Sequence, residues 1–76
     1  MIKAINTEYQ SQVEEAYELL LIYDDLDNKR TNAEALDEWS KVEVYDKQCE
    51  RVFNEYLEAI EDLPQEEIDN IDREVY

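Results

Sequence analysis

The sequence predicts a small, elongated all-α protein built from three helices. Its 76 residues include no Gly and one Pro, whereas tight β-hairpin turns depend heavily on Gly. Apolar residues recur at intervals of three and four, which is the spacing of one helix face. A chain this short buries only about 60% of the surface that it exposes when unfolded. We therefore expect one domain over residues 1–76 with a thin core.

The first helix is predicted over about residues 7–27. Asn6 or Thr7 is a suitable N-cap. The apolar stripe that follows consists of Tyr9, Val13, Ala16, Leu20 and Tyr23. The polar segment 28–32 interrupts the stripe and is predicted to connect two antiparallel helices.

The second helix is predicted over about residues 32–62. Thr31 and Glu34 fit a capping box, in which the two residues satisfy each other's backbone N–H groups. The apolar stripe of this helix consists of Ala35, Trp39, Val42, Tyr45, Cys49, Val52, Tyr56, Ala59 and Leu63. We expect Trp39 in the core, and also Cys49, because free Cys is among the most buried residue types.

A third helix is predicted over about residues 64–74, with Pro64 at or near its first position. At 1.5 Å per residue, the second helix would span ~45 Å. That length allows the first and third helices to fold back on it, so the second helix is expected to be central.

The residues that catalysis needs are largely missing, and we expect neither an enzyme nor a cofactor. The chain has no His and one Cys, so it cannot form a Ser–His pair, a Cys–His pair or an internal disulfide. Gly-rich phosphate-binding motifs cannot occur without Gly.

A metal site is not expected either. If Asp25 began an EF-hand loop, Arg30 and Leu36 would occupy the positions that require Gly and Glu. The longest apolar run, residues 19–23, is too short to cross a bilayer. The first residues also lack the apolar segment of a signal peptide, so the predicted location is the cytoplasm.

Charge is the strongest functional signal. The 22 acidic and 7 basic residues give a net charge of −15, concentrated in two blocks. Residues 4–27 contain seven acids and no base, and residues 50–76 contain ten acids and two bases. Like charges four residues apart destabilise a helix, so selection for folding alone would favour mixed signs. The blocks therefore favour a functional role, although a solvated face selected for solubility is the alternative.

Rows of carboxylates on a rigid helix can imitate rows of phosphates. We therefore expect a non-enzymatic inhibitor that blocks the basic nucleic-acid-binding groove of a target protein or nuclease complex. It should bind neither nucleic acid nor a membrane directly, because both would repel it. The expected contact residues are Glu14, Glu15, Glu18, Asp24, Asp25, Asp27, Glu50, Glu55, Glu58, Glu61, Asp62, Glu66 and Glu67.

In size, helical class and charge, the chain is similar to anti-defence proteins of phages and mobile elements. These include anti-CRISPR and anti-restriction proteins and DNA mimics, and the analogy implies a bacterial host cytoplasm. Two alternatives remain open. One is an acidic antitoxin or immunity-type partner of a basic protein, and the other is a structural scaffolding module. The protein is expected to be a monomer or a homodimer.

Overall fold

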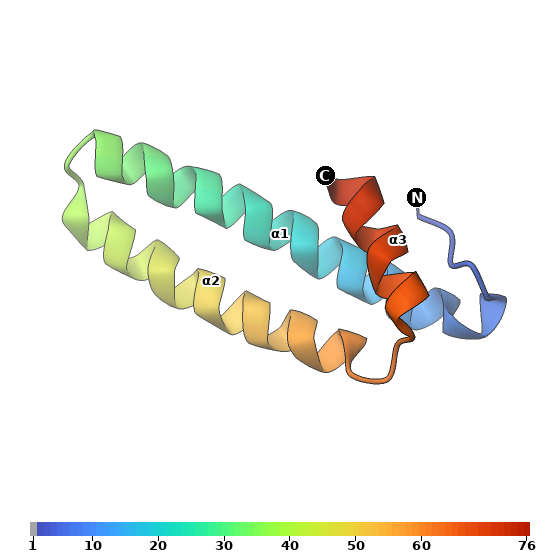
Figure 1. The fold of residues 1–76 in the computed structure, drawn as a ribbon. Helices are drawn as coiled ribbons and strands as arrows, with labels where there is room; N and C mark the ends of the chain where they lie inside the picture. Colours follow the sequence, from blue (N-terminus) through green and yellow to red (C-terminus); the bar gives the residue numbers. More distant parts are fainter. Residues whose placement is uncertain (1) are drawn as a thin grey trace.

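The computed structural model describes residues 2–76, and Met1 lies outside the described residues. In this range a 3-10 turn, η1 (Thr7–Tyr9), precedes three helices, α1 (Gln10–Ala35), α2 (Trp39–Ile60) and α3 (Gln65–Val75). Helices α1 and α2 form an antiparallel hairpin, and α3 crosses α1 (Figure 1). The molecule measures 45 × 20 × 17 Å. The predicted all-α, elongated three-helix arrangement is therefore confirmed.

The hairpin has two ends that differ in structure and charge. We call residues 28–49 the turn end, because they include the α1–α2 connection. Residues 2–27 and 50–76 form the terminal end, where both chain termini lie (Figure 1). Only the terminal end has a third helix.

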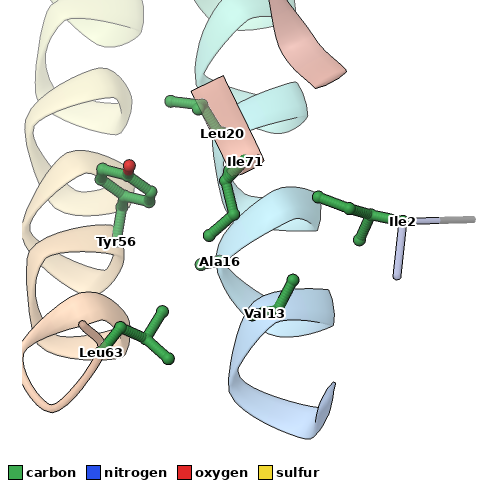
Figure 2. Packing of buried hydrophobic residues seen from close by; sticks show 7 residues of the cluster. All are labelled: Ile2, Val13, Ala16, Leu20, Tyr56, Leu63 and Ile71. Atoms are coloured by element: carbon green, nitrogen blue, oxygen red, sulfur yellow. The ribbon is translucent and has the colours of Figure 1, made fainter. Parts of the chain in front are cut away.

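The main hydrophobic core lies at the terminal end, where side chains from all three helices meet (Figure 2). Its buried members are Ile2, Val13, Ala16, Leu20, Tyr56, Leu63 and Ile71. Burying one large aliphatic side chain contributes roughly 1.5–3 kcal/mol, so a few residues supply much of the stability. Burial of Val13, Ala16 and Leu20 confirms the stripe predicted for the first helix.

The predicted boundary between the first two helices is wrong. Helix α1 continues through residues 28–32, and the connection lies at residues 36–38. Within this polar segment, Lys29 and Arg30 pair with carboxylates one turn earlier in the same helix, and such pairs each stabilise a helix by about 0.2–0.5 kcal/mol. Thr31 does not cap a helix, since its Oγ1 donates to the carbonyl of Asp27 at 3.0 Å.

Helix α1 ends in a Schellman motif without the usual Gly. Asp37 has a φ of 57°, in the left-handed region that Gly occupies most easily. The Asp37 N–H donates to the Glu34 carbonyl at 3.1 Å, and the Glu38 N–H donates to the Ala33 carbonyl at 2.9 Å. These two bonds close the last turn of α1 and reverse the chain.

The shifted boundary also changes which helix is central. Helix α1 has 26 residues, against 22 in α2, and α3 packs mainly against α1. The first helix therefore takes the central position expected for the second. Trp39 begins α2 beside the connection and is 63% exposed, so its predicted core position is wrong, whereas Cys49 is buried as predicted.

The segment before η1 is fixed by side chains from both α1 and α3. The Gln10 amide accepts from the Ala4 N–H at 2.8 Å and donates to the Ile2 carbonyl at 3.0 Å. Asn70 of α3 donates to the Lys3 carbonyl at 2.8 Å. The side chain of Asn6, one of the two caps predicted for the first helix, instead caps η1 by accepting from the Glu8 N–H.

Candidate protein-binding surface

The two acidic blocks of the sequence meet at one end of the molecule. Because α1 and α2 are antiparallel, the first half of α1 lies beside the second half of α2 (Figure 1). The terminal end thus contains seventeen acids and three bases, a net charge of −14. The turn end contains five acids and four bases, a net charge of −1. Almost all of the net charge of the molecule therefore lies at the terminal end.

The salt bridges increase this difference in charge between the two ends. In the part of the chain that the structure describes, every salt bridge uses a base from the turn end. Arg30 joins the two helices by donating from Nη2 to Asp27 Oδ1 at 2.8 Å and from Nη1 to Asp46 Oδ1 at 3.1 Å. These bonds raise the pKa of Arg30, and the hydrogen bond with Asp25 raises that of Lys29.

The terminal end keeps most of its carboxylates free of ion pairs. Within residues 2–76, Lys3, Arg51 and Arg73 form no salt bridge, and only Asp25 and Asp27 of this end are paired. The predicted contact residues that are exposed are Glu15, Glu18, Asp25, Glu50, Glu55, Glu58, Glu61, Asp62 and Glu66. The half-buried ones are Glu14, Asp24 and Asp27.

Glu67 does not belong to this surface, and its prediction as a contact residue is corrected. It is 2% exposed, and both of its carboxylate oxygens accept hydrogen bonds from the N-terminal segment. The Ile5 N–H donates to Oε1 at 2.7 Å, and the Asn6 N–H donates to Oε2 at 3.1 Å. Glu67 therefore holds residues 5 and 6 against α3 and is unavailable to a partner.

Helix α3 also carries three exposed carboxylates that are not among the predicted contact residues, namely Asp69, Asp72 and Glu74. Asp69 and Asp72 line a shallow depression of about 540 Å³ together with Ile5, Glu66 and Arg73. The ten acids of residues 50–76 already signalled this region. What the sequence did not reveal is that the N-terminal segment lies beside α3 and completes the depression.

Cys49 and the Tyr23–Phe53 ring pair have structural roles. Burial raises the pKa of the Cys49 thiol, despite the nearby charge of Arg30, so its nucleophilic thiolate is disfavoured. The Tyr23 and Phe53 rings lie 5.6 Å apart and join α1 to α2. No cluster of three or more metal-ligating side chains occurs in residues 2–76.

Comparison with known proteins gives no relative. The chain matches no family model, and no curated protein or solved structure is significantly similar to it. Across residues 2–76, no helix is both long and apolar enough to cross a membrane.

Proposed function

We propose that the protein is a non-enzymatic inhibitor whose terminal end occupies the basic nucleic-acid-binding groove of a target protein. The supporting observation is that two acidic blocks, separated by more than twenty residues, meet on a folded surface with few ion pairs. A phage or mobile-element anti-defence role, of the anti-CRISPR or anti-restriction kind, is the setting in which we expect this activity.

The fold presents this charge rigidly. Most of the acidic residues lie on helices that share the main hydrophobic core, so their backbone positions are set before binding and only side-chain freedom is lost on ordering them. Glu55 and Glu58 are exposed along α2, and Glu61 is exposed at its C-cap with helical backbone angles. Each step of three residues rises ~4.5 Å. The phosphates of one DNA strand advance 3.4 Å per nucleotide along the axis, so a groove that binds phosphates meets charges at comparable spacing.

The missing ion pairs also favour binding to a basic partner. A carboxylate already paired within the chain would have to exchange one cation for another, with little net gain. Free carboxylates instead attract Lys and Arg from a distance, accelerate the encounter and make it sensitive to salt. Association should therefore slow as the ionic strength rises and the Debye length falls below about 8 Å.

The first experiment is affinity capture from a nuclease-treated bacterial lysate, followed by elution with duplex DNA or RNA. We expect a nucleic-acid-binding protein to be retained and then displaced by the competitor. A basic protein that is retained but not displaced would instead favour the antitoxin-type alternative. If no basic protein is retained, the acidic surface serves solvation and the proposal fails.

Two variants with equal charge changes then locate the surface. Glu55→Lys with Glu58→Lys alters the terminal end, and Glu34→Lys with Glu43→Lys alters the turn end. All four residues are exposed, so both proteins should keep their helicity by circular dichroism. We expect the first variant to lose on the order of tenfold or more in affinity for the captured target, because it brings like charges together. The second should change affinity by no more than about twofold, since neither of its residues belongs to the proposed contact surface. Equal losses would contradict placement of the site at the terminal end.

A further inference from the structure

A cluster of aromatic rings between α1 and α2 reaches the surface of the terminal end. The ring centroids of Tyr23 and Phe53 lie 5.6 Å apart, and those of Phe53 and Tyr56 lie 6.2 Å apart. We call these three residues the ring cluster. Tyr56 is buried in the main core and Tyr23 is half-buried, whereas Phe53 is 41% exposed. Part of an aromatic surface is therefore open to a partner at Phe53.

Carboxylates from α1 and α3 lie near the ring cluster. Tyr76 directly follows α3, and its pKa is raised by desolvation first and then by Asp24, Asp72 and Tyr23. Desolvation, and then Asp72 and Tyr76, likewise raise the pKa of Tyr56. Charges act on a pKa in this way only at short range, so the end of α3 and Asp24 lie close to the rings. Neither Asp24 nor Asp72 forms a salt bridge within residues 2–76.

We propose that the ring cluster, with Asp24 and Asp72 beside it, receives an arginine side chain of a basic partner protein. A guanidinium group can lie flat on an exposed ring while its N–H groups donate to neighbouring carboxylates. The ammonium group of Lys is compact and strongly hydrated, so it stacks less well and cannot donate in the same forked geometry. The carboxylates therefore favour a cation, and the exposed ring favours a planar one.

Charge complementarity selects this occupant over others. The ring cluster and both carboxylates belong to the terminal end, whose net charge is −14. An apolar partner segment would desolvate the carboxylates without supplying an opposite charge, which is unfavourable. A second copy of this chain would bring another surface of −14 to the same place. The inference rests on the function proposed above, because it names the side chain by which a basic partner would contact the terminal end.

The test compares two peptides with blocked termini, in which Gly alternates with either Arg or Lys, so that length and charge are equal. Each peptide is titrated into the full chain at low ionic strength, and binding is followed by NMR. We expect the Arg peptide to bind at least about threefold more tightly than the Lys peptide. The largest shifts should be those of the Tyr23 and Phe53 ring protons. Equal affinities, or shifts spread evenly over the acidic residues, would overturn the proposal.

Substitutions then isolate the contribution of the exposed ring, with circular dichroism to check that each variant stays helical. Phe53→Leu keeps an apolar side chain without a ring, and should weaken binding of the Arg peptide by about two- to fivefold. Phe53→Tyr keeps a ring and should bind as the parent does. Leu57→Ala, one turn further along α2, removes an apolar side chain of similar exposure, 45%, and should leave both affinities unchanged. If Phe53→Leu binds the Arg peptide as tightly as the parent, the proposal is wrong.

Failure of this inference and failure of the proposed function give different results. Suppose that a captured target is displaced by nucleic acid, yet binds Phe53→Leu as tightly as the parent. That result would contradict the arginine site alone. If no basic protein is captured, the proposed function fails, whereas the two peptides still decide whether the ring cluster prefers Arg.

Discussion

Replacing Asp37 with Gly should stabilise the protein. Asp37 has left-handed backbone geometry, with a φ of 57°, and the two bonds that close the Schellman motif depend on that geometry. Left-handed geometry costs a non-Gly residue roughly 1–2 kcal/mol, less for Asp than for most residues. Gly loses about 0.5–1 kcal/mol more backbone entropy on folding. The net expectation is a gain of about 0.5 kcal/mol in the free energy of unfolding.

The assay is thermal and urea unfolding followed by circular dichroism at 222 nm. A gain of this size should raise Tm by roughly 2–4 °C, since 1 kcal/mol corresponds to about 4–8 °C in a chain of this length. Asp37→Asn separates the effect of charge from that of geometry, because Asn also tolerates left-handed backbone. The Asp37 carboxylate lies between the C-terminus of α1 and the N-terminus of α2. The dipole of α1 disfavours its negative charge there, and the dipole of α2 favours it. Asp37→Asn should therefore change the stability little.

Asp37→Ala gives the opposite test. Ala has no local hydrogen-bonding side chain to support left-handed geometry, so we expect a loss of about 0.5–1 kcal/mol. The reasoning would be refuted if the Gly variant melted at or below the parent temperature while the Ala variant melted above it. That order would mean that residue 37 does not have left-handed geometry in solution.

Two further predictions concern the terminal end. Glu67→Gln should lower the free energy of unfolding by about 1–3 kcal/mol, because its amide N–H₂ would face a partly buried backbone N–H that now has an acceptor. Glu66→Gln, on the exposed neighbour, should stay within about 0.5 kcal/mol, and equal Tm changes in the two variants would contradict a structural role for Glu67. Burial raises the pKa of Tyr56 above its ordinary value of 10, so above pH 10 the unfolded chain releases this proton first. Stability should therefore fall as the pH rises from about 10 through the pKa of the folded state. Urea titrations between pH 8 and 11 should show a shallower fall for Tyr56→Phe, and parallel curves would exclude this contribution.

The helix content and much of the core could be predicted because they depend on local spacing. The intervals of three and four that link Val13, Ala16 and Leu20 placed these residues on one face, and burial confirmed it. The helix boundary could not be predicted in the same way. Gly usually marks a left-handed cap, and Asp37 gives no such signal.

The misplaced connection accounts for the error at Trp39. In an unbroken helix over residues 32–62, Trp39 belongs to the apolar stripe. In the structure, it begins a new helix at the edge of the hairpin, where α1 no longer covers it. The burial of Glu67 was beyond sequence reasoning for another reason, since its partners lie more than sixty residues away along the chain. The meeting of the two acidic blocks follows from the antiparallel packing of α1 and α2, which the polar connection between two apolar stripes predicts.

The bonds between Glu67 and the first residues also constrain the order in which the chain can fold during synthesis. Residues 5 and 6 leave the ribosome early, but their acceptor lies in α3. Until residues 65–75 have been made, the N-terminal segment has no carboxylate to hold it, and Ile71 is missing from the core. The α1–α2 hairpin can form first, but its apolar side chains at the terminal end remain open to chaperones and proteases. The core at the terminal end can therefore close only after α3 has been made.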